Sequence, residues 1–206
     1  MKILIAIPTL DYIPVQFMEC LLKLTQHLND NDVDFEVKIK AGTLVYLARE
    51  ELTSYALSFG FTHVLWLDSD MIFNEDVADE LLDTGKEFIS GIFHARRPGH
   101  QSCIFKSLTP PERYKWDEYP NDTFAIAGCG MACTLVKTTV LQEVRKTYGS
   151  CFTPSQMLGE DLAFCKKATD LGFAIWAEPT LRIGHIGHIA IYPEDEGRYL
   201  DNLFKR

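Results

Sequence analysis

His63-Val64-Leu65-Trp66-Leu67-Asp68-Ser69-Asp70 is the most informative segment of the chain, because an apolar, strand-like run ends there in two acidic residues. Residues two apart on an extended chain point the same way, so the carboxylates of Asp68 and Asp70 are expected to meet at one place. Two carboxylates held close together repel each other unless a cation lies between them, and magnesium or manganese is the simplest choice. The alternative is an Asp-Ser-Asp turn that caps the following helix without any metal.

Strands and helices alternate along the first third of the chain. Residues 2–7, 35–39 and 63–67 are predicted strands, and helices are expected behind Pro14 and from about 43 to 59. This alternation predicts an α/β fold with a Rossmann-like, mostly parallel central sheet flanked by helices, together with a smaller second sheet. Such sheets bind ligands beyond the carboxyl ends of their strands, which is where the acidic pair is expected.

Bulk properties exclude several classes of protein. The 206 residues suit a single domain, and a formal charge of −9 with a pI near 5.1 argues against a nucleic-acid partner. Six cysteines without paired spacing indicate reduced thiols and a cytoplasmic location, with no structural zinc. The apolar amino-terminal run is too short for a signal peptide, and no membrane segment is predicted.

A second acidic pair, Glu160 and Asp161, follows Gly159 at the predicted start of a helix. Acidic residues are favoured there by the helix dipole alone, and that explanation requires no function. On a helical wheel, however, Asp161 falls on the same face as Phe164 and Cys165. An acidic side chain on this inward face either caps the helix or borders a cleft, where it could act as a general base.

Two histidines lie in the glycine-rich segment Arg182-Ile183-Gly184-His185-Ile186-Gly187-His188. Neutral imidazole is a common third ligand beside carboxylates, although a single histidine is more often structural. Residues three apart on a strand face opposite sides, so His185 and His188 are not both expected to reach one metal ion.

In order along the chain, these motifs resemble the type A glycosyltransferase fold. The similarity is greatest to the large inverting family that includes cellulose, chitin and hyaluronan synthases and small bacterial or viral sugar transferases, and it spans about residues 3–190. It is carried by Ala6-Ile7-Pro8-Thr9, Ala48-Arg49-Glu50, Thr62 to Asp70, Gly128-Cys129-Gly130, Gly159-Glu160-Asp161 with Leu171-Gly172, and Arg182-Ile183-Gly184-His185.

The resemblance implies a role for each matching residue. Asp161 corresponds to the general base that deprotonates the acceptor, and Asp68, Asp70 and His185 correspond to ligands of Mn²⁺ or Mg²⁺. The nucleotide-sugar donor would be bordered by Pro8, Thr9, Asp11, Arg49, Asp68, Ser69, Gly128, Gly130 and Glu160.

The resemblance also implies the division of the single domain, 1–206. Residues 1–92 would form the nucleotide-binding half and residues 123–192 the acceptor and catalytic half. Between them, the segment 94–121 contains four prolines and is expected to be a loop or lid, and residues 193–206 a tail helix.

The implied reaction moves a sugar from a nucleotide-diphosphate sugar to a hydroxyl of a carbohydrate or other acceptor, with inversion. The chain lacks the Gln-x-x-Arg-Trp signature of processive synthases, which favours a single addition. It also has Lys38 to Gly42 where many family members carry acidic residues and a serine for base recognition, and Glu50 where asparagine is common. The nucleotide, the sugar, the acceptor, retention of configuration and the oligomeric state therefore stay open.

Three other classes share parts of this pattern. A sugar nucleotidyltransferase normally has a Gly-rich, basic phosphate loop after its first strand, and residues 7–12 lack one. A glycoside hydrolase would pair Asp161 with Asp68 or Asp70, which leaves His185 without a role. The third alternative is a non-catalytic domain that binds a nucleotide sugar or a carbohydrate.

Overall fold

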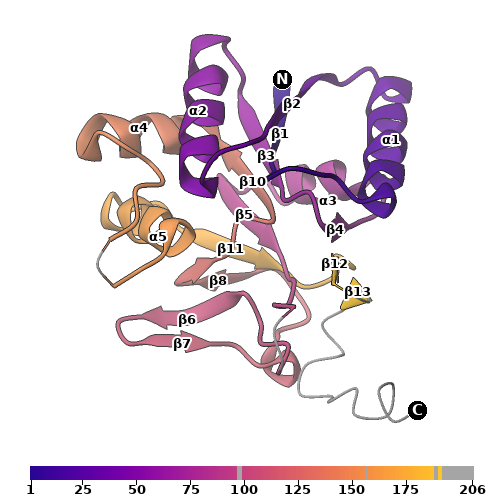
Figure 1. The fold of residues 1–206 in the computed structure, drawn as a ribbon. Helices are drawn as coiled ribbons and strands as arrows, with labels where there is room; N and C mark the ends of the chain where they lie inside the picture. Colours follow the sequence, from indigo (N-terminus) through magenta and orange to yellow (C-terminus); the bar gives the residue numbers. More distant parts are fainter. Residues whose placement is uncertain (97–98, 156, 188–189, 192–206) are drawn as a thin grey trace.

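The protein is an α/β structure built on a seven-stranded sheet (Figure 1). The structure is a computed structural model that describes residues 1–96, 99–155, 157–187 and 190–191. The strand order is β2-β1-β3-β10-β5-β11-β8, and all strands except β10 and β8 run in the same direction. Their bounds are β1 Lys2–Pro8, β2 Asp34–Lys40, β3 His63–Leu67, β5 Phe88–Gly91, β8 Phe124–Ile126, β10 Cys133–Lys137 and β11 Ile175–Glu178. The predicted mostly parallel α/β architecture is confirmed.

Helices cover both faces of the sheet (Figure 1). The first strand shows why, because both sets of its alternating side chains are apolar. Ile3, Ile5 and Ile7 pack with α1 (Val15–Asp30) and α3 (Val77–Asp83). Leu4 and Ala6 belong to the opposite core, which contains residues of α2 (Val45–Ser58), α4 (Thr138–Tyr148) and α5 (Glu160–Asp170). A strand with two apolar faces is typical of a sheet buried between two helical layers.

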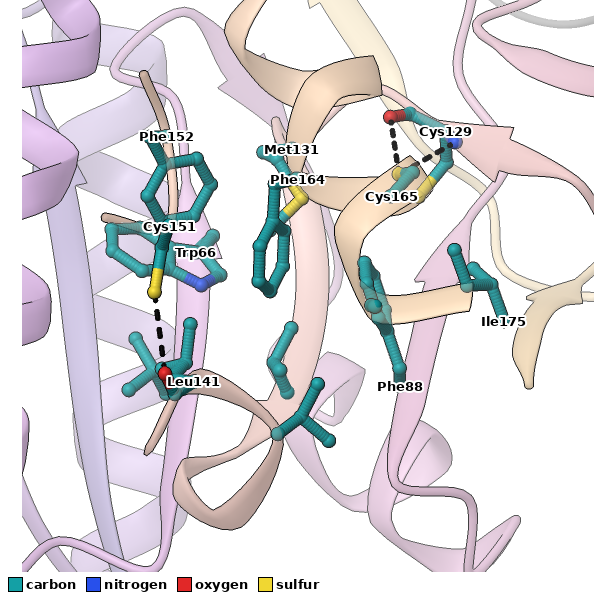
Figure 2. Packing of buried hydrophobic residues seen from close by; sticks show 14 of the residues in the cluster. Trp66, Phe88, Cys129, Met131, Leu141, Cys151, Phe152, Phe164, Cys165 and Ile175 are labelled. Atoms are coloured by element: carbon teal, nitrogen blue, oxygen red, sulfur yellow. Dashed lines mark hydrogen bonds between the residues drawn. The ribbon is translucent and has the colours of Figure 1, made fainter. Parts of the chain in front are cut away.

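A row of aromatic rings fixes α5 against the sheet (Figure 2). The rings of Trp66 and Phe152 lie 5.2 Å apart between centroids, those of Phe152 and Phe164 4.6 Å, and those of Phe164 and Phe88 5.2 Å. Trp66 belongs to β3 and Phe164 to α5. The row therefore sets the position of the amino-terminal end of α5 relative to the acidic end of β3.

Two three-stranded sheets complete the fold, where one was expected. In the first, β12 (Gly184–Ile186) lies between β4 (Met71–Ile72) and β13 (Ala190–Ile191). In the second, β6 (Ile104–Leu108) lies between β7 (Pro111–Arg113) and β9 (Gly128–Cys129). The first of these sheets holds the glycine- and histidine-rich segment against the acidic one, because His185 pairs with Met71.

The segment 94–121, which was expected to be a loop or lid, contains regular structure. It contains the β6–β7 hairpin and a short 3₁₀ helix, η1 (Trp116–Glu118). The proline that obscured the hairpin, Pro111, lies on the edge strand β7, where a missing N–H breaks no interior ladder. The helix α3 was also not foreseen. The expected tail helix 193–206 and His188 lie outside the described residues.

Within the described residues, none of the helices combines the length and the apolar character that crossing a bilayer requires.

Candidate functional site

A cleft of about 1260 Å³ opens beyond the carboxyl ends of β1, β2 and β3. This is the expected ligand position. The strands β2 and β3 lie on opposite sides of β1, and parallel sheets bind ligands at the point where the strand order reverses in this way. The sequence-predicted residues that line the cleft are Pro8, Thr9, Asp11, Asp68, Ser69 and Asp70. They share it with Leu10, Tyr12, Pro14, Gly42, Thr43, Leu44, Val45, Leu47, Arg96, Ile186 and Gly187.

Hydrogen bonds connect the loops that border this cleft. The hydroxyls of Thr9 and Ser69 lie 2.9 Å apart, which joins the loop after β1 to the acidic segment after β3. The Thr9 hydroxyl also donates to the main-chain carbonyl of Tyr12 over 3.2 Å, and the Tyr12 N–H donates to an Asp11 carboxylate oxygen over 2.9 Å. The hydrogen bond between Thr9 and Ser69 thus holds the segment that carries Asp68 and Asp70 against the loop after β1.

Asp70 lies between a histidine and an arginine. Its Oδ1 is 3.5 Å from Nε2 of His185, and its Oδ2 is 3.0 Å from Nη1 of Arg96. Burial alone would raise the pKa of Asp70, but His185 and Arg96 outweigh it and hold the pKa below its ordinary value. The Asp70 carboxylate is therefore ionised at neutral pH.

The hydrogen bonds of His185 suit a ligand of a cation. Its Nδ1 donates to the main-chain carbonyl of His94 over 2.7 Å, so in the neutral ring the lone pair of Nε2 faces the Asp70 carboxylate. Two acceptors that face each other require a proton or a cation between them. A main-chain carbonyl behind a ligating imidazole is also the usual second shell of a protein metal site.

Asp68 does not complete a three-residue metal site with this pair. Within the described residues, no group of three or more His, Cys, Asp or Glu side chains is arranged to hold a metal ion. Asp68 is instead paired with Arg49, because its Oδ1 accepts a hydrogen bond from Nη2 of Arg49 over 3.0 Å. The donor set that fits a hard cation is thus Asp70 with His185, and Mn²⁺ or Mg²⁺ bound there would depend on ligand or water oxygens for its other contacts.

Arg49 occupies a different place from the one expected. It does not line the cleft, because its side chain is only 1% exposed. The guanidinium carbon lies 5.7 Å from the ring centroid of Trp66 and 5.9 Å from that of Phe152. Nη2 and Nε of Arg49 face the carboxylates of Asp68 and Asp161. The expected contact with a bound donor is therefore not available to Arg49.

A second, smaller hollow of about 190 Å³ borders Asp161. It is lined by Cys103, Phe105, Arg113, Gly130, Gly159, Glu160, Asp161 and Leu162. Asp161 Oδ1 lies 3.4 Å from Nε of Arg49. Burial raises the pKa of Asp161 to about 7; Arg49 lowers it, while Glu160 and Asp68 add to the rise. A carboxylate that titrates near neutral pH and faces a hollow can accept a proton from a bound hydroxyl.

The predicted glycines separate into two roles. Gly130 lines the hollow beside Asp161, and a Cβ there would come within 2.8 Å of the Phe93 ring. Gly128 is buried, and a Cβ would meet Leu108 at 3.1 Å and Cys165 at 3.2 Å. Gly128 thus lies at a close contact with side chains of β6 and α5 and lines neither hollow. Like Gly130, Glu160 belongs to the smaller hollow and not to the cleft where a donor was expected.

Sequence reasoning missed two arginines of the site. Arg96 follows β5 and ion-pairs with Asp70, and Arg113 lines the smaller hollow from β7 and packs over the Phe105 ring at 4.4 Å. A basic residue just after a predicted strand was an available signal for Arg96. Arg113 lay in the segment expected to be a loop, and no local pattern indicated the strand that positions it.

Comparisons with known proteins agree with the fold. No protein-family model matches the sequence, and no curated protein matches it. Among solved structures, the chain is similar to A197 from STIV, with a TM-score of 0.63 and 17% sequence identity. The similarity covers 94% of this chain and 91% of that one, so the shared architecture extends over nearly the whole of both molecules. At this level of identity, the comparison supports the fold alone.

Proposed function

We propose that the protein is a metal-dependent glycosyltransferase of type A fold, which moves a sugar from a nucleotide-diphosphate sugar to an acceptor hydroxyl with inversion. The observation that carries the proposal is the arrangement of the two hollows. Asp68 and Asp70 border a cleft large enough for a nucleotide, Asp161 borders a hollow beside it, and Arg49 lies between Asp68 and Asp161.

The large cleft suits the donor. It begins at the carboxyl ends of parallel strands, and exposed Leu10, Tyr12 and Leu44 in its lining are available to a flat nucleobase. The Asp70 carboxylate and the Arg96 guanidinium line the same cleft. A lining with both apolar and charged side chains suits a ligand that combines a base with a diphosphate.

A cation would be held by Asp70 and His185 and would supply charge neutralisation for the departing diphosphate. Arg96 contributes in the same direction, because its guanidinium lies at the same carboxylate and can hydrogen-bond phosphate oxygens. Asp68 lies at the cleft wall, where a carboxylate can accept hydrogen bonds from ribose hydroxyls.

Asp161 would act as the general base. Burial raises the pKa of Asp161 to about 7, which makes its carboxylate basic enough to accept the hydroxyl proton as the new bond forms. The proton moves from the acceptor oxygen to Asp161 while that oxygen attacks the sugar carbon and the diphosphate leaves. The proposed product has inverted configuration because attack and departure occur on opposite faces.

A binding and turnover screen tests this proposal. Thermal shifts are measured with nucleoside diphosphates of each base, with and without Mn²⁺, followed by transfer or hydrolysis of the matching nucleotide sugars. We expect metal-dependent stabilisation by at least one nucleotide and turnover that excess chelator removes and Mn²⁺ restores. Absence of any nucleotide effect, or full turnover in chelator, would contradict the proposal.

A further inference from the structure

One buried guanidinium connects the two hollows. Nη2 of Arg49 donates to Oδ1 of Asp68 over 3.0 Å, and Nε of Arg49 lies 3.4 Å from Oδ1 of Asp161. Asp68 comes from the end of β3 and Asp161 from the first turn of α5, so only Arg49, on α2, links the two carboxylates by ion pairs in the part of the chain described. Asp68 lines the large cleft and Asp161 the smaller hollow, while Arg49 lines neither.

The side chains around Arg49 restrict the position of its guanidinium group. The rings of Trp66 and Phe152 pack against the guanidinium at 5.7 and 5.9 Å, and the Phe152 N–H donates in turn to the carboxylate of Glu50, the residue next to Arg49. Within the described residues, Nε and Nη1 of Arg49 and Oδ1 of Asp161 make no hydrogen bond. The guanidinium is therefore shared between two acidic side chains, with hydrogen-bonding capacity left over on the side of Asp161.

We infer that Arg49 is a positioning residue that couples the two hollows, so that a ligand drawing on the Asp68 carboxylate strengthens the contact between Arg49 and Asp161. The physical reason is that a buried cation must be compensated. When ribose hydroxyls or another donor group engage Asp68, the guanidinium interacts more strongly with Asp161. Occupation of the donor cleft would then orient and ionise the base for the acceptor. This inference rests on the proposed function for the role of Asp161 as a base.

The charged and titratable groups around Asp161 support the assignment. Glu160 lies beside it on α5, and Asp68 faces it from the end of β3. Arg113 approaches from β7, Cys103 from the position just before β6, and Cys129 from β9. The main chain of Met131 also hydrogen-bonds to the Asp161 carboxylate. Among these groups Arg49 is the strongest influence that lowers the pKa of Asp161, against the upward effects of burial, Glu160 and Asp68.

The test measures the Asp161 carboxyl directly, by a ¹³C NMR titration of aspartate-labelled protein without donor, with Asp161→Asn to assign the signal. Arg49→Met should raise the pKa of Asp161 by about 1–3 pH units, the usual effect of losing an opposite charge at ion-pair distance. Arg49→Lys should restore part of the lowering. Asp68→Asn should lower the pKa of Asp161, because Arg49 is then left to that carboxylate alone. Arg145→Lys, which alters the neighbouring Glu50 contact, should leave the pKa of Asp161 unchanged.

A double-mutant cycle separates coupling through Arg49 from direct repulsion between Asp68 and Asp161. In an Arg49→Met background, Asp68→Asn should have much less effect on the Asp161 pKa than in the native protein. An undiminished effect would overturn the inference, and so would a wild-type pKa in Arg49→Met. If Arg49→Met does not fold, the same cycle is run in Arg49→Gln, which also lacks the positive charge.

Failure of this inference is distinguishable from failure of the proposed function, because the titration requires no turnover. A protein that binds no nucleotide would still show or lack the predicted changes in the Asp161 pKa. Conversely, if the protein transfers sugar but Asp68→Asn leaves the pKa of Asp161 unchanged, the proposed function holds and the inferred coupling is wrong.

Discussion

His185 and Asp70 approach each other through Nε2 and Oδ1 at 3.5 Å, while the other ring nitrogen of His185 is held by the main-chain carbonyl of His94. This hydrogen bond fixes the ring plane and leaves Nε2 to the carboxylate. The sheet that pairs β12 with β4 produces the contact, because it places the histidine strand directly beside the residues that follow Asp70.

We therefore predict that His185→Ala weakens Mn²⁺-dependent nucleotide binding by more than about tenfold, which is the scale of effect seen when even an outer-shell partner of a metal ligand is lost. Calorimetric titration with and without Mn²⁺ measures it. His188→Ala is the matched control, and a larger effect of His188→Ala would show that the wrong imidazole was assigned.

Asp161→Asn removes the proposed base while keeping the shape of the side chain. Transfer should fall by about 10²–10⁴-fold, the usual contribution of general acid–base catalysis. Donor binding should change far less, and only through the contact between Arg49 and Asp161, because Asp161 lies outside the donor cleft. The two quantities are measured by a single-turnover transfer assay and by nucleotide titration. Ordinary turnover in this variant would exclude Asp161 as the base.

The pH dependence of kcat/KM should follow the ionisation of Asp161 in the free enzyme. Burial raises the pKa of this carboxyl to about 7, and only its deprotonated form can accept the hydroxyl proton. Activity is therefore expected to be constant above that pH and to fall about tenfold for each pH unit below it, as a single ionisation requires. A profile that stays flat down to pH 5 would contradict the assignment.

Phe152 belongs to the aromatic row and also packs against the guanidinium of Arg49. Its removal should therefore affect both the stability of the fold and the position of Arg49. Phe152→Ala is expected to lower the free energy of unfolding by about 3–5 kcal/mol, as for other fully buried aromatic residues. Urea denaturation measures this, with Leu22→Ala on the exposed side of α1 as the control that stays within about 0.5 kcal/mol. A small effect at Phe152 would mean that the aromatic row contributes little to the stability of the fold.

Local patterns were sufficient for the strands and helices of the first 67 residues. The predicted strand 63–67 coincides with β3, and α2 lies within the predicted helix from 43 to 59, because both rest on side-chain periodicity and on residues that begin or end an element. The inward direction of Asp161 followed from the helical wheel in the same way. These features depend only on neighbours within a few residues along the chain.

The place of Arg49 could not be predicted in this way. It depends on Trp66 and Phe152, which are distant in sequence and meet at Arg49 only after α2 and α5 have packed on the same face of the sheet. The β6–β7 hairpin was missed for a related reason. Its strands are short, and their pairing with β9 is a long-range contact that leaves no periodic signal.

The pairing of the β6–β7 hairpin with β9 restricts movement of the hairpin beside Asp161. Ile104 and Phe105 pair with Cys129 and Gly128, and the Gly130 N–H donates to the Cys103 carbonyl over 2.8 Å. Main-chain hydrogen bonds therefore hold the β6–β7 hairpin against β9 and Gly130 beside Asp161. Moving the hairpin away from Asp161 would break several of these hydrogen bonds at once. We expect amide exchange at Gly130 to be slow and indifferent to added nucleotide. The hollow beside Asp161 would then keep its shape when an acceptor binds, so that the acceptor is selected by its complementarity to that shape. Any movement that shields the donor from water would involve the loops that carry Leu10 and Leu44.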